Sequence, residues 1–422
     1  MNDLLPDGWC LKSCRELCHV ITKGTTPSSL GFDFQDSGIN FIKVESINSN
    51  GIIDAGKFSF ISDEANLALK RSIIFEGDIL ITIAGATVGK LAIARNIHLP
   101  ANTNQALAIV RTNERKVFRT YLLYWLQTDY IKRSIDAIKT VGAQPNLSLA
   151  QVGGFLVNLP PLPEQQKIAQ ILTSVDEVIE KIQAQIDKLK DLKTAMMQEL
   201  LTKGIGHVEF KDSPVGRIPV GWDVGSFDEL FTLKNGVNKG KEFFGKGIPI
   251  ISYRNVYDGG GIYDEQITGL VDLNEDELNR FQVKYGDLFI TRTSETPEEI
   301  GYVNVYLGNR NNVVFNGFVI RARQTSEQLN PTYCKYAFQT YAMRNQMILN
   351  SKFTTRAGIS GESLARLKIA IPTKNEQEKI TKVLSAIDDR IDTLADNNKA
   401  KKSMKKALMQ DLLTGKVRVK VS

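Results

Sequence analysis

The chain repeats a long segment at almost half its length. Residues 164–203 align with residues 376–415 at an offset of 212 in a chain of 422 residues, and fifteen of the forty aligned positions are identical. Solenoid repeats have periods of about 20 to 50 residues. The sequence therefore predicts one duplicated domain rather than an array, with two units that are each large enough to bury a core.

Shorter echoes of the repeat lie outside this segment. Leu5–Trp9 returns as Ile218–Trp222, and Gly77–Thr82 returns as Gly286–Thr291, with offsets between 209 and 213. Only a few insertions therefore separate the two halves, and their folds should be alike along most of the chain.

Both copies of the repeated segment carry apolar residues at alternating steps of four and three, which is the heptad pattern of a coiled coil. The first seam consists of Ile168, Leu172, Val175, Ile179, Ile182, Ile186, Leu189, Lys193, Met196 and Leu200. The second consists of Ile380, Leu384, Ile387, Ile391, Leu394, Asn398, Lys401, Lys405, Leu408 and Leu412. We expect two long helices that pack together.

The middle of the second seam is polar, and two interpretations of Asn398 stay open. A buried Asn in a seam lowers stability but fixes the alignment of the helices. Alternatively, the seam faces solvent at this point, or the helix has drifted so that Met404 takes its place.

The helix ends have clear signals. Both segments follow prolines, at Pro160–Pro163 and Pro372, and both stop near a glycine, at Gly204 and Gly415. About 40 residues at 1.5 Å each give a rod of roughly 60 Å. Packed under a pseudo-twofold axis, two such rods should run antiparallel.

The composition narrows the class of protein. The formal net charge is +6, which permits a polyanionic partner without requiring one. No stretch approaches the eighteen apolar residues of a membrane span, and the first residues do not resemble a signal peptide. We therefore expect a cytoplasmic protein without a membrane partner.

Three cysteines near the N-terminus form the one constellation that could mimic a metal site. Cys10, Cys14 and Cys18 are four residues apart, which would place three thiols on one face of a helix. The spacing does not match zinc sites. In the second half, Phe227 and Phe231 take the places of Cys14 and Cys18, so we interpret these positions as apolar helix positions and expect no metal.

Between the tryptophans and the long helices, each half alternates stretches typical of strands and of helices. Strands are expected at 38–44, 78–83, 107–111, 247–253, 287–291 and 318–323, and helices at 118–139 and 331–349. Each half should therefore be a mixed α+β domain.

The sequence supplies no recognisable catalytic set. Gly85–Lys90 resembles a phosphate loop, but it has too few residues between its glycines and lacks the Ser or Thr that reaches magnesium. We interpret it as a tight loop that can approach a DNA phosphate. His19, His98 and His207 lie in unrelated contexts, and we expect surface or packing roles for them. No cofactor is expected.

Taken together, these motifs resemble the specificity subunit of type I restriction-modification systems. The resemblance rests on the helix entry at 161–168, the connector at 210–222, the strand and loop at 77–90, and the tail at 412–417. It spans essentially the whole chain, and the order of the motifs together with the repeat makes it specific.

The resemblance implies an α+β fold with two pseudo-twofold-related target-recognition domains separated by two long antiparallel coiled-coil helices. It places the first target-recognition domain at 1–158, a helical spacer at 159–203, a connector at 204–222, the second target-recognition domain at 223–370 and a C-terminal helical spacer at 371–416. Two different readers in one chain suit an asymmetric bipartite DNA site, with half-sites about one helical turn of roughly 34 Å apart.

The resemblance also implies partners. The helices would dock modification (methyltransferase) subunits, two in number, and restriction (motor-nuclease) subunits would join through the complex. The chain itself would be a non-catalytic DNA-recognition subunit. Two alternatives remain open: a coiled-coil scaffold with protein-binding domains, and a nuclease with an unrecognised site.

Contacts to double-stranded DNA are expected from Lys, Arg, Asn and Thr on loops, since these side chains suit base edges and phosphates. In the first half the candidates are Lys23, Thr25, Thr26, Lys43, Thr87 and Lys90. In the second half they are Lys234, Asn235, Lys239, Arg254, Asn255, Arg292 and Thr293. Acidic residues at 295–299 replace the basic loop of the first half, so this loop either points away from DNA or uses only Arg292 and Thr293.

Overall fold

A computed structural model describes residues 5–48, 51–139 and 146–420 of the chain. The chain divides into two compact units: unit 1 contains residues 1–183 and 396–422, and unit 2 contains residues 184–395. Each unit holds one globular part and a portion of both long helices, whereas the ranges expected from the sequence keep each helix whole. Within the described ranges, none of the helices is long and apolar enough for a membrane span.

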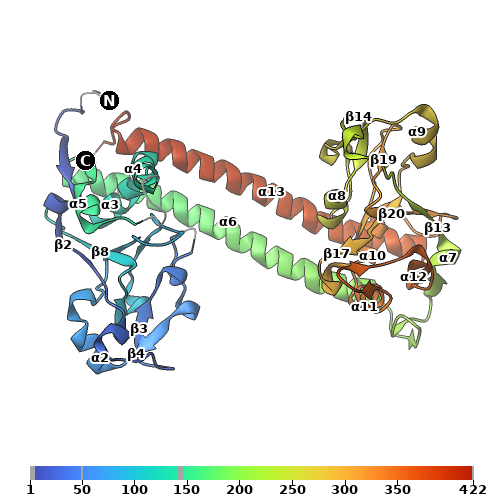
Figure 1. Ribbon diagram of the computed structural model, residues 1–422, viewed down its shortest axis with the longest axis horizontal. Coiled ribbons are helices and arrows are strands. Elements are labelled where there is room, and N and C mark those ends of the chain that lie inside the picture. The colour runs from blue at the N-terminus through green and yellow to red at the C-terminus, as the bar shows by residue number, and fades with distance from the viewer. Residues whose placement is uncertain (1–4, 49–50, 140–145, 421–422) are drawn as a thin grey trace. The chain divides into compact units, whose positions relative to one another are not determined.

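The two long helices are α6 (Leu162–Lys203) and α13 (Lys374–Leu413). As predicted, each follows a proline and stops before a glycine, and Gly204 and Gly415 have φ angles of +67° and +77° that favour glycine. Within each unit the portions of α6 and α13 run in opposite directions (Figure 1). The antiparallel arrangement predicted from the sequence is therefore present in both units.

Every predicted seam position in both helices is buried or half-buried, as a heptad seam requires. The structure also decides between the two interpretations of the polar centre. Asn398 is 3% exposed, whereas Met404 is 43% exposed. The Asn398 amide donates to Oε1 of Gln183 across the helix pair at 3.1 Å. Asn398 thus lies in the seam, and the helix has not drifted to Met404.

The globular part of unit 1 is built on two sheets and one strand pair. An antiparallel sheet has the order β2-β8-β5-β6, and a second sheet has the order β4-β3-β7, with β3 and β7 parallel. The strands are β1 (Cys10–Ser13), β2 (Cys18–Lys23), β3 (Ile39–Ile42), β4 (Ser59–Ile61), β5 (Ile79–Thr82), β6 (Leu91–Ile93), β7 (Ala101–Thr103), β8 (Leu107–Thr112) and β9 (Leu156–Leu159). The shorter helices are α1 (Cys14–Leu17), α2 (Asp63–Ala68), α3 (Arg119–Leu126), α4 (Asp129–Lys139) and α5 (Leu149–Gly154).

Unit 2 repeats both sheets and the strand pair, and it adds the pair β10-β11 and a small sheet of the order β17-β22-β21. Its sheets have the orders β13-β20-β16-β18 and β15-β14-β19, and β12 pairs with β23 as β1 pairs with β9. The strands are β10 (Phe210–Lys211), β11 (Ile218–Pro219), β12 (Asp223–Ser226), β13 (Phe231–Asn235), β14 (Phe244–Ile251), β15 (Leu270–Val271), β16 (Leu288–Thr291), β17 (Thr293–Ser294), β18 (Val303–Val305), β19 (Val314–Phe315), β20 (Val319–Gln324), β21 (Lys352–Phe353), β22 (Ala357–Gly358) and β23 (Lys368–Ile371). The shorter helices are α7 (Phe227–Leu230), α8 (Tyr253–Tyr257), α9 (Glu275–Phe281), α10 (Pro331–Ala337), α11 (Tyr341–Leu349) and α12 (Gly361–Ala365).

One expectation about local structure is wrong. Cys10, Cys14 and Cys18 do not share a helix face, because Cys10 begins β1, Cys14 begins the single-turn helix α1, and Cys18 begins β2. Ser13 caps the start of this turn and forms a capping box with Glu16, and the backbone is extended again at Cys18, where the helix has ended. Burial raises the pKa of Cys14, and burial also raises that of Cys18 to about 12, so both thiols behave as small apolar groups.

The repeated Gly-Asp pair holds each large sheet together. Asp78 and Asp287 directly precede β5 and β16, and both side chains are 1% exposed. Each carboxylate accepts two hydrogen bonds of 2.7–2.8 Å from one arginine of the neighbouring strand, Arg111 in β8 and Arg323 in β20. Such bidentate pairs fix orientation as well as adding energy. The repeat of this motif is therefore explained by the fold.

The repeated Glu-Gln pair ties each globular part to a long helix. Gln165 accepts from the backbone N–H of Phe118 at 2.8 Å, and Gln377 accepts from that of Asn330 at 2.7 Å. Both glutamines also donate to the proline carbonyl five residues earlier, at 2.8 and 2.9 Å. The first turn of each long helix thus anchors the domain that precedes it.

Candidate nucleic-acid interface

The predicted contacts of unit 1 gather around one turn, residues 103–107. The chain passes from β2 through Gly24 so close to the Thr103 carbonyl that a Cβ on Gly24 would lie 1.9 Å from this oxygen. Lys23, Thr25 and Thr26 flank this glycine. Lys43 follows β3, whose end pairs with the end of β7 at Thr103.

The loop that contains Thr87 and Lys90 joins the same turn. It follows β5, and the backbone N–H of Ile83 donates to the Ala106 carbonyl at 2.8 Å. Lys90 is half-buried, and its Nζ donates to the Ile47 carbonyl at 3.1 Å. The structure therefore brings together all six predicted residues of unit 1, and it adds Arg71, which donates to Oγ1 of Thr25 at 3.2 Å.

Unit 2 builds the equivalent turn at Asn316–Phe318. Gly236 approaches the Asn316 carbonyl as Gly24 approaches that of Thr103, since a Cβ there would lie 2.1 Å from the oxygen. Asn235 is exposed and precedes this glycine. The backbone N–H of Arg292 donates to the Phe318 carbonyl at 3.0 Å, so Arg292 and Thr293 reach the same turn.

Four other predicted residues of unit 2 have different surroundings. Lys234 donates to the Arg280 carbonyl at 2.6 Å, and burial together with nearby arginines lowers its pKa. Lys239 is 2.7 Å from a carboxylate oxygen of Glu277. Asn255 completes a capping box with Ser252 at the start of α8, whereas Arg254 on the same helix is exposed and pairs with the exposed Asp258 at 3.4 Å. The structure thus gives three of these four side chains a role within the domain.

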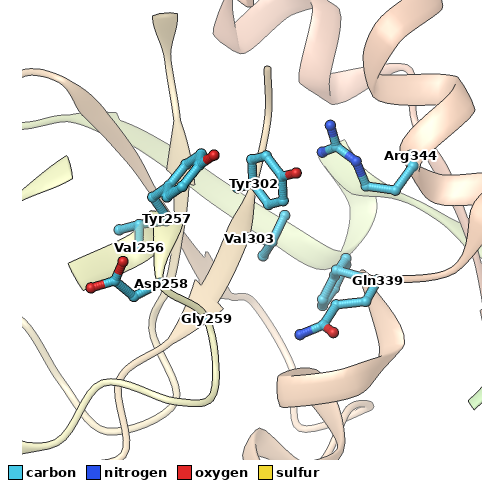
Figure 2. Close-up of a pocket in the computed structure, with 9 residues that line it drawn as sticks. Val256, Tyr257, Asp258, Gly259, Tyr302, Val303, Gln339 and Arg344 are labelled. Atoms are coloured by element: carbon cyan, nitrogen blue, oxygen red, sulfur yellow. The ribbon is translucent and has the colours of Figure 1, made fainter. Parts of the chain in front are cut away.

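A pocket of about 330 Å³ opens beside α8 in unit 2. Figure 2 shows Tyr257, Tyr302 and Arg344 around it. The ring centroids of the two tyrosines are 5.0 Å apart, and the Arg344 guanidinium carbon lies 4.5 Å from the centroid of Tyr302. Tyr302 occupies the repeat position of Lys90. The two backbone carbonyls accept equivalent bonds of 2.9 Å, from the N–H of Thr82 at the end of β5 and from that of Thr291 at the end of β16. One place in the fold therefore carries lysine in unit 1 and an aromatic pocket in unit 2.

The acidic segment of unit 2 is largely engaged within the domain. Glu299 accepts from the Tyr257 hydroxyl at 3.0 Å, the Glu298 carbonyl accepts from Arg344 at 2.8 Å, and a Glu295 oxygen lies 3.2 Å from Arg356. Arg292 and Thr293 precede this segment.

Sequence reasoning missed the hairpin Lys352–Gly358 of unit 2. Its strand β22 pairs with both β21 and β17, so Gly358 lies opposite both Lys352 and Thr293. Residues 352–356 read Lys-Phe-Thr-Thr-Arg, and all five are exposed. The strands are two residues long, which is too short for an alternating pattern, but basic residues around threonines could have drawn attention to the segment.

The histidines are placed as expected for packing and surface groups. His98 is 5% exposed, and its Nδ1 accepts from the Arg95 backbone N–H at 3.1 Å. Burial and then the Arg95 charge lower its pKa. His207 Nε2 lies 2.8 Å from Glu376, and His19 is exposed.

Comparison with known proteins assigns the family. The model of the type I restriction modification DNA specificity domain matches twice, over residues 6–191 and 219–402. A putative type I restriction enzyme MjaX specificity subunit of Methanocaldococcus jannaschii is 28% identical over 99% of this chain and 95% of its own length. The EcoKI specificity subunit of Escherichia coli is 23% identical, over 92% and 84% respectively.

Solved structures show the same fold. A chain from a structural study of the assembly and conformational transition of the type I R-M system has a TM-score of 0.58 at 16% identity, and it covers 98% of this chain. An S subunit of a type I restriction-modification system from M. genitalium has a TM-score of 0.55 at 13% identity, with 98% covered. With the family model matched over most of its length, this chain belongs to the type I restriction-modification DNA specificity family.

Proposed function

We propose that this chain is the DNA-recognition subunit of a type I restriction-modification complex, and that each globular part reads one half of a bipartite asymmetric site. The observation that supports this most directly is the contrast within the repeat. The two units keep the same sheet orders and the same anchoring bonds. They differ around the two equivalent turns. Lys90 of unit 1 is replaced by Tyr302 in unit 2, and basic side chains occur on the exposed hairpin of unit 2.

Within this proposal, contacts to DNA come from the two equivalent turns. In unit 1 the residues are Lys23, Thr25, Thr26, Lys43, Thr87 and Lys90, and in unit 2 they are Asn235, Arg254, Arg292 and Thr293. Lys234 and Lys239 are left out of this set because they bind α9, and Asn255 because it completes the capping box of α8. Lys90 is kept, although its Nζ donates to the Ile47 carbonyl, because its loop reaches the turn.

The long helices set the distance between the half-sites and dock the partners. A helix of 42 residues, such as α6, is roughly 60 Å long. We propose that two modification subunits bind the helices, that restriction subunits join through them, and that the methyl transfer is performed by the modification subunits. This chain is then non-catalytic.

The proposal is tested by selecting DNA from a random duplex pool with the chain and its modification subunits. We expect a split motif with two constant halves and an unread spacer of fixed length. A pool without such a motif would favour a scaffold role instead. In parallel, DNA is incubated with the chain alone and divalent metal or methyl donor, and turnover there would refute the non-catalytic assignment.

A further inference from the structure

The hairpin Lys352–Gly358 of unit 2, called here the 352–358 ribbon, carries five consecutive exposed residues, of which Lys352 and Arg356 are positively charged. Its base is fixed, since Ala357 and Ile359 are 0% and 3% exposed and belong to the main core of the unit. Its tip is free of this core: Phe353 is 57% exposed, and Thr354 and Thr355 are exposed. A rigid base and an open tip are the conditions for inserting side chains into a partner.

The ribbon lies next to residues already proposed for DNA contact. Ala357 and Gly358 pair with Ser294 and Thr293 of β17. The backbone N–H of Ile359 donates to the Arg292 carbonyl at 3.0 Å. Three chain segments thus form one small sheet, which carries the positive charges of Arg292, Lys352 and Arg356.

The charge on this sheet is available to a polyanion. Among the described residues Arg356 forms an ion pair with Glu295 at 3.2 Å, and the two side chains are 69% and 80% exposed. Exposed pairs of this kind contribute little, about 0–1 kcal/mol, so a phosphate or a base edge can replace Glu295. No partner within the domain binds the Lys352 ammonium among the described residues.

The repeat indicates that the ribbon serves discrimination rather than folding. Unit 1 makes one corresponding bridge, between Ala84 and Asn146. Between the aligned positions, however, residues 140–145 read Thr-Val-Gly-Ala-Gln-Pro, with no basic residue, whereas residues 352–357 contain Lys352 and Arg356. Residues 140–145 lie outside the described residues. A shared bridge beside segments of different chemistry is what two readers of different half-sites require.

We propose that the 352–358 ribbon enters the major groove of duplex DNA and determines the half-site that unit 2 reads. The major groove admits a two-stranded ribbon, and its base edges are distinguished by Arg, by Thr hydroxyls and by apolar contact with the thymine methyl. Thr354, Thr355 and Arg356 at the tip contact base edges, and Lys352 contacts a phosphate. The inference rests on the proposed DNA-recognition function and specifies which element carries it.

The test uses the chain with its modification subunits and compares three variants with the wild type. The variant T354V/T355V removes the hydroxyls of the tip, and K352A/R356A removes its charge. The matched control K211A/R217A removes the same charge from the other exposed hairpin of unit 2, β10–β11, whose Lys211 and Arg217 are exposed. Assembly with the modification subunits shows that each variant is folded.

Selection from random duplexes then reports each half-site separately. We expect T354V/T355V to relax or change one half of the motif and to leave the other half intact. K352A/R356A should weaken binding by about tenfold or more and reduce the slope of log K against log salt by about 1, since Lys352 is the phosphate contact that is lost and each such contact contributes roughly 0.9. The control should change neither the motif nor the slope.

The outcomes separate this inference from the proposed function. If the wild-type complex selects a split motif and both ribbon variants select the same two halves, the ribbon is not the reader, even where affinity falls. If the wild type selects no split motif, the proposed function fails with it. A change in both halves, or an equal effect of the control, would also overturn the assignment.

Discussion

In each unit a glutamate in the first turn of a long helix binds a tryptophan of the globular part, but the residue that completes this contact differs between the two units. In unit 1, Glu164 accepts from the Trp9 indole at 3.1 Å and from two nitrogens of Arg418 at 2.7 and 2.8 Å. In unit 2, Glu376 accepts from the Trp222 indole at 2.8 Å, and His207 Nε2 lies at 2.8 Å. Glutamate and tryptophan are kept, whereas the residue that completes the site is exchanged.

A second site differs in the same way. Asp176 in unit 1 binds Lys405 at 2.7 Å and Tyr124, and Asp388 in unit 2 binds the equivalent Lys193 at 2.6 Å and Tyr336. Unit 2 adds Lys335 at 2.8 Å, where unit 1 has Leu123. The bonds that both units share, called here the frame, are therefore kept between long helix and globular part, whereas the residues around each of these bonds differ between the units.

The largest effects are expected where the frame is identical in both units. Asp78→Ala and Asp287→Ala each leave an arginine without its bidentate partner and remove the acceptor of a backbone N–H. Breaking such a buried pair typically costs about 3–5 kcal/mol. Hydrogen exchange measured by mass spectrometry should show the loss of protection confined to the unit that carries the change. Unequal losses in the two units would contradict the view that this bond serves the same purpose in both.

The anchoring glutamates should show a smaller and unequal effect. Glu164→Gln keeps an acceptor for Trp9 but loses the charge that binds Arg418, and we expect about 2 kcal/mol of lost stability in unit 1. Glu376→Gln should cost less, because Ile205 still donates a backbone N–H to this side chain. Exchange rates in the first turns of α6 and α13 report the two losses separately. An equal loss would mean that the residue that completes this contact is unimportant.

Much of the frame follows from the sequence, because it rests on local patterns. The heptad predicts both long helices and their seams, and prolines and glycines predict their ends. Partners far apart in the chain could not be predicted: Arg111 is 33 residues from Asp78, and no spacing rule links them. The cysteine spacing gave a wrong expectation for a related reason. Residues four apart share a face only within one helix, and the three cysteines belong to three different elements.

The candidate interface was predicted in part. Loop chemistry identified Lys23, Lys90 and Arg292, which the fold brings to equivalent turns. It could not show that Lys239 is bound to Glu277, because this partner comes from a distant helix. The 352–358 ribbon was missed because strands of two residues carry no periodicity, and only the pairing with β17 reveals it.

The extra lysine of unit 2 can be removed by copying unit 1. Lys335→Leu leaves Asp388 with Lys193 and Tyr336, and we expect a loss of about 1 kcal/mol. Burial raises the pKa of Asp388, but bonds from Lys193, Lys335 and Tyr336 outweigh this and hold it below its usual value.

A depressed pKa in the folded state gives stability that is present above the unfolded pKa of about 3.9 and is lost as pH falls below it. The wild-type unit 2 should therefore lose protection below about pH 4, and Lys335→Leu should lose less over the same interval. The matched control is Lys402→Leu, an exposed lysine of α13 in unit 1. An unchanged pH profile in Lys335→Leu would show that Lys335 does not act on Asp388.

The smallest effect on stability is expected at Asn398, although its effect on recognition can be larger. Its repeat position in α6 is Ile186, so Asn398→Ile makes the two seams alike. The change removes the bond to Gln183, which is itself exposed, and should be neutral or stabilising by at most about 1 kcal/mol. A polar seam residue selects one alignment of a helix pair. We therefore expect the selected DNA to contain more than one spacer length with Asn398→Ile, and one length with the wild type and with Asn397→Ile, whose position is exposed. A single spacer length in all three would show that the alignment is fixed by the apolar seam alone.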